Sequence, residues 1–208
     1  MCGRYNIDDY EKNFEMQGIF QEVYERYNGT QELASMKTGE IFPTDIAPVL
    51  AQENEKPRAF LMKWGFPRFD GKGVIINARA ETALEKNMFR SSIAARRCLI
   101  PTTGFFEWKQ EDDQGGKGRK TKYLIRLKDT PVLYLAGIFN TFKDMNGHPV
   151  VSYVIITTDA NESMIRIHNR MPYILTGQKK DIWLYDSGLS QELLQEKCEE
   201  ELEPVVCK

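Results

Sequence analysis

The pattern of hydrophobic and polar positions predicts strands in the middle of the chain, with helices at both ends and between strands. Apolar residues recur at helical spacing over 8–26, behind an N-cap at Asp8 or Asp9, which predicts one or two short helices. Runs rich in β-branched and aromatic residues predict the strands, expected at 58–66, 73–77, 97–101, 104–109, 122–127, 131–141 and 150–158. The pattern therefore indicates the α+β class.

Prolines, glycines and further helical patterns complete this outline. Two prolines predict an extended but irregular segment at 41–50, while 111–120 predicts a flexible turn and 145–148 a hairpin. Short helices are expected at 81–95, 160–166, 177–185 and 189–200. We expect one domain over 1–208, a strongly bent antiparallel or mixed sheet or an open barrel with short peripheral helices, and an acidic helix and tail at about 189–208.

Length and composition exclude several classes of protein. A chain of 208 residues, 41% hydrophobic and 28% charged, buries a core and is neither disordered nor collagen-like. No apolar run approaches the roughly 20 residues that cross a bilayer. Residues 1–14 turn polar and acidic at once, unlike a signal peptide. We therefore expect an intracellular protein without a membrane partner.

Charge is nearly balanced along the whole chain but is unevenly distributed. There are 28 Lys and Arg against 30 Asp and Glu, with a pI near 5.8, which argues against a protein that coats nucleic acid over its whole surface. Basic residues outnumber acidic ones within 79–97, which allows a local groove for a few phosphates. Solvated arginines on a helix face are the alternative interpretation.

The cysteines favour free thiols over a metal site. None of them forms a CxxC pair and the chain has only two His, so a zinc site is not expected. Cys98 lies in an apolar stretch and is expected to pack as a small buried hydrophobe. Cys198 and Cys207 lie among carboxylates, which disfavour the thiolate. No organic cofactor is implied either.

Cys2 differs from the other three cysteines because it follows Met1. Aminopeptidases remove an initiator methionine that precedes a small residue, and Cys2 would then carry both a free α-amine and a thiol. Such an aminothiol forms a Schiff base with an aldehyde and closes to a thiazolidine, and it also permits autocatalytic amide chemistry. The alternative is that Cys2 is merely a small residue early in the chain.

Three further segments carry candidate chemistry. Asn77 and Arg79 follow a short apolar strand on one side of it, where an amide orients an amine or thiol and a guanidinium holds a phosphate; an N-cap and a surface arginine are the alternative. Glu107 stands between Phe106 and Trp108, a setting that raises a carboxyl pKa unless Glu107 faces solvent. His168 precedes a proline and either moves protons or is an ordinary loop histidine.

These motifs together resemble one known family. MCGRY at 1–5, WGFP at 64–67, INARAET at 76–82, RCLIPTTGFFEWK at 97–109 and IHNRMP at 167–172 occur in the order seen in the SRAP family. These SOS-response-associated proteins crosslink to abasic sites in single-stranded DNA. The resemblance covers roughly residues 2–185.

The resemblance implies a role for each matching residue. Cys2 would be the nucleophile, and Asn77 would position its backbone and amine. Glu107 would move protons during sugar ring opening and Schiff-base formation, and His168 would act beside the abasic site and assist reversal. Phosphate contacts are implied for Arg4, Arg79, Arg170 and Thr157. An apolar or aromatic surface for bases is implied for Phe42, Pro43, Trp64, Pro67 and Phe69.

Two departures from the family pattern affect what is expected. The C-terminal LEPVVCK lacks the Val/Asn-containing segment of many members, so the closing edge of the fold is not predicted. WGFPRFDGKG has fewer aromatic residues than usual, so a weaker wedge against flanking duplex is expected.

The resulting hypothesis is covalent capture of abasic sites in single-stranded DNA by a cytoplasmic, nucleoid-associated monomer, with the replication machinery as a further partner. The alternatives are a cysteine peptidase with autoproteolytic activity and a non-covalent single-stranded DNA-binding module, in which Cys2 is incidental.

Overall fold

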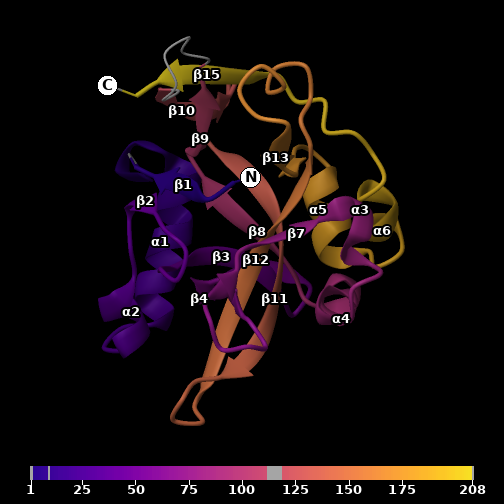
Figure 1. The fold of residues 1–208 in the computed structure, drawn as a ribbon. Coiled ribbons are helices and arrows are strands. Elements are labelled where there is room, and N and C mark those ends of the chain that lie inside the picture. Colours follow the sequence, from indigo (N-terminus) through magenta and orange to yellow (C-terminus); the bar gives the residue numbers. More distant parts are fainter. Residues whose placement is uncertain (1, 9, 112–118, 208) are drawn as a thin grey trace.

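The computed structural model describes residues 2–8, 10–111 and 119–207, and Figure 1 shows the arrangement of its helices and strands. The helices are the 3-10 helix η1 (Tyr10–Lys12), α1 (Phe14–Arg26), α2 (Gln31–Ser35), α3 (Ala80–Ala83), α4 (Asn87–Ala95), α5 (Lys179–Tyr185) and α6 (Leu189–Leu193). The strands are β1 (Arg4–Ile7), β2 (Gly39–Ile41), β3 (Ile46–Glu53), β4 (Lys56–Trp64), β5 (Phe66–Pro67), β6 (Val74–Ile75), β7 (Asn77–Arg79), β8 (Arg97–Thr102), β9 (Gly104–Gln110), β10 (Lys120–Leu127), β11 (Leu133–Lys143), β12 (Pro149–Asp159), β13 (Arg170–Pro172), β14 (Ile174–Leu175) and β15 (Leu202–Val206).

A barrel of five strands forms the centre of the molecule. The strands run in the order β12-β4-β3-β8-β11, and β11 pairs with β12 again, so the ring closes. The β12–β4 pair is parallel and the other pairs are antiparallel, which makes the barrel mixed. Buried side chains from all five strands fill the core. The α+β class and the mixed sheet are confirmed.

A second sheet, antiparallel throughout, packs beside the barrel in the order β15-β10-β9-β1-β2. Only Thr103 separates β8 from β9, so the chain passes directly from the barrel into this sheet. The hydroxyl of Thr102 donates to the carbonyl of Asn6 at 2.6 Å and ties the crossing point to β1. The first strand of the chain, β1, consequently lies inside this sheet, between β2 and β9.

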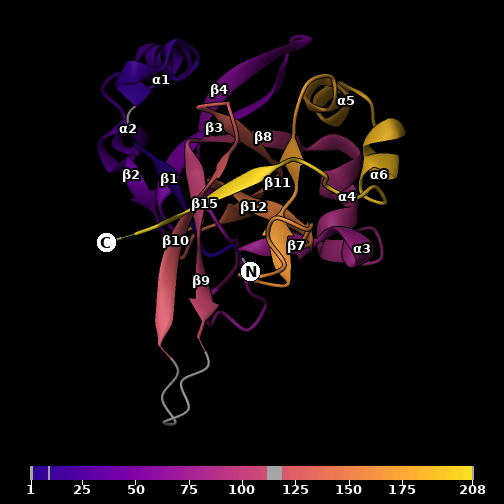
Figure 2. The same cartoon turned by 90° about the horizontal axis from the view of Figure 1, so that it is seen from above.

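The helices cover the two sides of this core. In Figure 2, α1 and α2 lie on one side, and α3 to α6 gather on the other. The α1 helix begins at Asn13, whose side chain accepts from the backbone N–H of Met16, and it buries Ile19, Phe20 and Val23. Among the described residues, none of the helices is long and apolar enough to cross a membrane.

Several expected helices differ from the observed ones. The helix expected at 81–95 is two helices, α3 and α4, interrupted at 84–86. The helix expected at 160–166 is wrong, because the Asn161 side chain accepts from the backbone N–H groups of Ser163 and Met164 and holds turns there. The helix α2 was not expected. The turn expected at 111–120 falls largely on 112–118, outside the described residues.

Two extended segments also depart from expectation. Residues 46–53 form the regular strand β3 despite Pro48, because β8 pairs with β3 only at Leu50 and Ala51, beyond the proline. At the other end of the chain, the helix expected at 189–200 ends at Leu193, and Leu202–Val206 is the strand β15. It pairs with β10 from Leu202 opposite Leu127 to Val206 opposite Tyr123. The LEPVV segment therefore closes this edge of the second sheet.

Candidate functional site

Cys2 lies two residues before the start of β1 and is completely buried. The side-chain amide of Asn77 donates from Nδ2 to the Cys2 carbonyl oxygen at 2.8 Å. Asn77 opens β7, which runs parallel to β12 with Asn77 opposite Ile155. In β7 only Ala78 turns inward, so Asn77 and Arg79 share the other side of the strand, as the alternation predicts. The structure therefore brings together two residues that the sequence separates widely.

Glu107 lies on β9, on the same face of the strand as the buried Phe105, and is 4% exposed. The alternative in which Glu107 faces solvent is therefore wrong. Its charge acts on Cys2: burial raises the pKa of the Cys2 thiol well above its ordinary value, and the nearby Glu107 carboxylate raises it further. The thiol is consequently not activated as a thiolate in this environment.

His168 lies in the turn before β13. Its Nδ1 accepts from the backbone N–H of Arg170 at 2.9 Å, which fixes the orientation of the ring. The strand β12 connects this turn with β7, because Thr157 stands opposite Pro172 of β13 and opposite Arg79 of β7. The NAR and HNRMP motifs thus meet across a single strand.

Arg170 is held by a dense set of contacts. One terminal nitrogen donates to Glu81 at 2.7 Å and to Asp159 at 2.6 Å, and the other donates to Glu81 at 3.0 Å and to the carbonyl oxygen of Thr157 at 2.8 Å. The side chain is only 12% exposed. Thr157 is itself fully buried. A phosphate at Arg170 would therefore compete with two carboxylates, whereas Arg79 is exposed.

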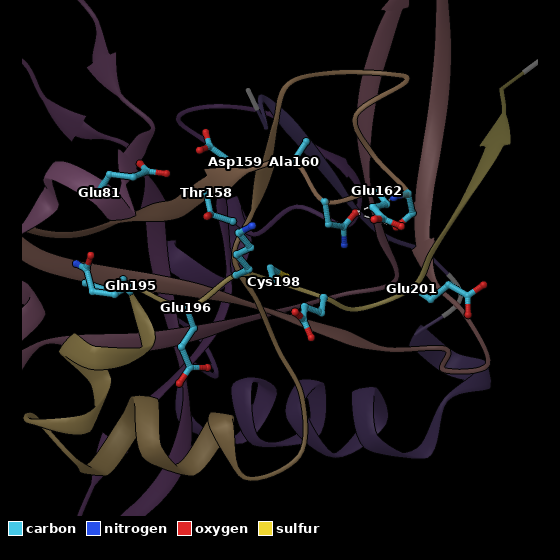
Figure 3. A pocket seen from close by; sticks show the side chains of 14 residues that line it. Glu81, Thr158, Asp159, Ala160, Glu162, Gln195, Glu196, Cys198 and Glu201 are labelled. Carbon is cyan, nitrogen blue, oxygen red and sulfur yellow. Dashed lines mark hydrogen bonds between the residues drawn. The ribbon is translucent and has the colours of Figure 1, made fainter.

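Beyond Arg170 lies an acidic cavity of about 1030 Å³, between α3, the end of β12 and the segment that follows α6 (Figure 3). Its carboxylates belong to Glu81, Asp159, Glu162, Glu196, Glu199 and Glu201, and Lys197 is the basic residue in its lining. Cys198 also lines it, and burial raises the pKa of that thiol to about 12, with the Glu200 carboxylate adding to the effect. Cys98 is fully buried, as expected. The cavity has the wrong charge for a phosphate backbone.

Arg4, on β1, is part of a group of cations and aromatic rings. Its guanidinium lies over the Phe42 ring, 4.5 Å from the centroid, and over the Trp108 ring at 5.0 Å, and it pairs with Glu40 at 3.0 Å. Glu40 also pairs with Lys122 at 2.7 Å. The sequence did not indicate Glu40 or Lys122, because their contacts arise from pairing between distant strands. The EW motif did indicate Trp108, the third residue of this group.

The residues expected to present a surface to bases divide into two groups. Phe42 is 41% exposed and Phe69 95% exposed; Pro67 is exposed as well, and Pro43 is half-buried. Trp64 is different, and the expectation for it is wrong. Its ring is fully buried and stacks on Tyr153, and its Nε1–H donates to the Ile76 carbonyl at 3.0 Å. An indole that fills the core in this way offers no face to a ligand.

A groove of about 530 Å³ adjoins Asn77. Ile75, Met88 and Phe89 give it an apolar lining, and the exposed Phe69 borders it. Among the described residues, no cluster of His, Cys, Asp or Glu has the arrangement of a metal site.

Fold and site together define an α+β protein built around a cysteine at the head of the chain. The chain matches the SOS response associated peptidase (SRAP) family over residues 1–206, and it belongs to that family. It is 32% identical over 206 residues to the abasic site processing protein YoqW of Bacillus subtilis, which covers 94% of this chain and 85% of the relative. Over 126 residues it is 33% identical to the abasic site processing protein HMCES of Gallus gallus, covering 52% of this chain and 37% of that protein. A crystal structure of a Bacteroides thetaiotaomicron protein superposes with a TM-score of 0.76 at 26% identity, covering 100% of this chain and 92% of the other.

Proposed function

We propose that this protein processes abasic sites in single-stranded DNA by covalent capture on Cys2, once Met1 has been removed. The observation that carries the proposal is the hydrogen bond from Asn77 to the Cys2 carbonyl, in a site that also contains Glu107. An open abasic sugar presents an aldehyde, and an aldehyde is the electrophile with which an aminothiol condenses. The names of relatives such as YoqW and HMCES support the same substrate.

The raised pKa of the buried Cys2 thiol supports an order of steps in which the amine acts before the sulfur. The α-amine adds to the C1′ aldehyde first, and loss of water gives a Schiff base. The sulfur then adds to the imine carbon while its proton leaves, which forms the C–S bond of the thiazolidine and returns the nitrogen to an amine. One water is released overall. Ring closure removes the imine from which strand cleavage by β-elimination would start.

Each neighbouring residue has a part in this sequence. Asn77 fixes the Cys2 backbone through Nδ2, and its buried Oδ1, which has no hydrogen-bond partner among the described residues, is available to accept from the new α-amine. Glu107 takes the thiol proton and supplies protons during ring opening. His168, with Nδ1 occupied by a backbone N–H, acts through Nε2 beside the sugar. The exposed Arg79 pairs with a phosphate.

Peptide cleavage in trans is less well supported by this site. A peptidase of this kind attacks the amide with a thiolate, whereas the pKa of the Cys2 thiol is raised; capture of an aldehyde starts at the α-amine instead. Two measurements test this alternative: self-cleavage of the protein at the Met1–Cys2 bond, and cleavage of unrelated peptide substrates.

The test is denaturing gel electrophoresis of the protein with a uracil-containing single strand, with and without uracil glycosylase. Mass spectrometry first confirms that Met1 is absent. We expect a shifted band that survives denaturant and requires both the glycosylase and Cys2, so that Cys2→Ala abolishes it. Cys98→Ala is the matched control, because it removes another fully buried thiol and leaves the band intact. A protein with a free Cys2 that yields no such band would overturn the proposal.

A further inference from the structure

Trp64 opens the WGFP motif, yet its ring is fully buried and the proposed reaction does not use it. Its indole Nε1–H donates to the carbonyl oxygen of Ile76 at 3.0 Å. Ile76 directly precedes Asn77, whose side chain holds the Cys2 carbonyl. A single peptide group therefore separates the indole from the residue that holds Cys2.

The Ile76 carbonyl oxygen has a second donor. The backbone N–H of Ile155, on β12, reaches the same oxygen at 3.1 Å. Because a peptide group is planar, two donors on its oxygen fix the plane that ends at the backbone nitrogen of Asn77. The strand β7 is only three residues long, and its pairing with β12 begins at Asn77 opposite Ile155. The indole thus holds β7 at the residue where this pairing begins.

The ring of Trp64 also supports the other partner of the Asn77–Cys2 hydrogen bond. Its centroid lies 5.2 Å from that of Tyr5, and it stacks on Tyr153 with the centroids 6.4 Å apart and the planes 8° from parallel. Tyr5 is on β1, three residues after Cys2, and Tyr153 is on β12. The two phenol hydroxyls share a hydrogen bond of 2.6 Å. The strand of Cys2 and the strand beside Asn77 are therefore both packed against one indole.

The residue after Trp64 fixes the same segment from another side. The backbone N–H of Gly65 donates to the Tyr153 carbonyl at 2.7 Å, and its φ of +115° is a conformation that other residues rarely adopt. A Cβ at Gly65 would lie only 2.8 Å from Cβ of Val74, so the chain just before Asn77 packs directly against the glycine. Both residues of the WG pair thus contact the segment that leads into Asn77.

We propose that Trp64 is a positioning residue for capture of the abasic site, because it holds the Ile76 carbonyl and, through it, the Asn77 amide at Cys2. This inference rests on the proposed function, since the role it assigns belongs to that reaction. A displacement of about 1 Å at a reacting group can slow a reaction about 100-fold. Trp64 is fully buried, so its loss should slow the covalent step and leave binding of the strand unchanged.

Trp183 provides a matched control. It is also fully buried, and its Nε1–H also donates to backbone carbonyl oxygens, those of Cys98 at 3.0 Å and Gly137 at 3.2 Å. These bonds fasten α5 to β8 and β11, which carry none of the residues assigned to the reaction. Trp64→Phe and Trp183→Phe therefore remove the same donor from two buried indoles, but Trp64→Phe alone removes the one that leads to Asn77.

Crosslinking is measured on denaturing gels with a uracil-containing single strand treated with uracil glycosylase, over a range of strand concentrations. We expect Trp64→Phe to lower the maximal rate about three- to tenfold, with the half-saturating strand concentration unchanged within about twofold. Trp183→Phe should keep the maximal rate within about twofold of that of the unmodified protein. Thermal melts followed by circular dichroism establish that each variant is folded at the assay temperature.

A double variant separates positioning through Asn77 from a general loosening of the fold. If Trp64 acts through Asn77, its loss has no further effect on a protein that already lacks the Asn77 amide. The double variant Trp64→Phe/Asn77→Ala should therefore crosslink as slowly as Asn77→Ala alone, whereas independent effects would multiply. Should Trp64→Phe melt below the assay temperature, benzothienylalanine at position 64 alone replaces it, because this residue keeps the shape of the ring and lacks the N–H donor.

Three results would overturn the inference. They are a maximal rate for Trp64→Phe equal to that of the unmodified protein, an equal loss for Trp183→Phe, and a loss in the double variant equal to the product of the two single losses. Crosslinking by the unmodified protein with a free Cys2 is scored first. Its absence refutes the proposed function and this inference with it, whereas crosslinking that is insensitive to Trp64→Phe refutes this inference alone.

Discussion

Replacing Glu81 by Gln tests how the turn that carries His168 is held in place. Glu81 makes two charged hydrogen bonds to Arg170, whose backbone N–H in turn fixes Nδ1 of His168. Asp159 makes a third charged hydrogen bond, at 2.6 Å, to the same guanidinium. The two carboxylates differ mainly in exposure, which is 42% for the Glu81 side chain and 83% for that of Asp159. The pair Glu81→Gln and Asp159→Asn therefore compares a partly shielded contact with an exposed one.

The expected magnitudes follow from that difference. A hydrogen bond to a charged group contributes about 1.5–3 kcal/mol when it is shielded. Solvent screening at Glu81 reduces this to about 1–2 kcal/mol, while a contact as exposed as that of Asp159 contributes about 0–0.5 kcal/mol. In a domain of this size, 1 kcal/mol corresponds to about 2–4 °C in Tm. Glu81→Gln should thus lower Tm by about 2–8 °C, and Asp159→Asn by less than about 2 °C.

The stabilisation that Glu81 provides should depend on pH. Burial is the largest single effect and acts to raise the pKa of Glu81. The hydrogen bond from Arg170, a backbone hydrogen bond and the charges of Arg170 and Arg79 together outweigh it, so the pKa lies below its ordinary value. A carboxyl with a lowered pKa stabilises the fold above its ordinary pKa, near 4.3, and that contribution is lost as the pH falls through the lowered value. Thermal melts are followed by circular dichroism at pH 7 and at about pH 3.5, which is below the ordinary pKa of a glutamate. The difference in Tm between the unmodified protein and Glu81→Gln should be smaller in acid. A Glu81→Gln protein that melts with the unmodified one at pH 7, or an equal loss for Asp159→Asn, would refute the reasoning.

Three further predictions concern other parts of the molecule. Asn77→Ala removes the 2.8 Å hydrogen bond to the Cys2 carbonyl and should slow crosslinking to glycosylase-treated DNA about tenfold; an unchanged rate in a gel time course would contradict the role of Asn77. Ellman's reagent at pH 8 should modify the half-exposed Cys207 well before the buried Cys198, and Cys207→Ser should remove the fast phase; a fast phase that persists would contradict it. Leu202→Ala should destabilise the protein by about 2–3 kcal/mol in urea unfolding, because Leu202 is 5% exposed at the start of β15; a change below about 0.5 kcal/mol would show that β15 does not contribute to stability.

The strands were predictable from the sequence where local pattern determined them. The alternation and β-branched content of 131–141 and 150–158 predicted β11 and β12, and the turn residues at 145–148 predicted their hairpin. The helix expected at 160–166 failed because an Asn side chain competed with helical hydrogen bonding. The strand β15 was missed because its partner, β10, lies about 80 residues earlier in the chain, and no local pattern encodes a pairing over that separation.

The site was predictable in its motifs but not in its packing. The order of motifs indicated Cys2, Asn77, Glu107 and His168, and the structure brings Asn77 and Glu107 to Cys2. The burial of Trp64 could not be foreseen, since an aromatic residue beside Gly and Pro suits an exposed loop as well as a core. The contacts of Arg4 depend in the same way on strands that pair at long range.

The position of β1 between β2 and β9 imposes an order of events on the newborn chain. β1 can take its place beside β9 only when β9 has been made, about 100 residues later, which at 5–20 residues per second takes about 5–20 s. Until then the first strand lacks one of its two partners in the sheet. The speed of synthesis over the first half of the chain thus sets how long β1 waits for its place between β2 and β9.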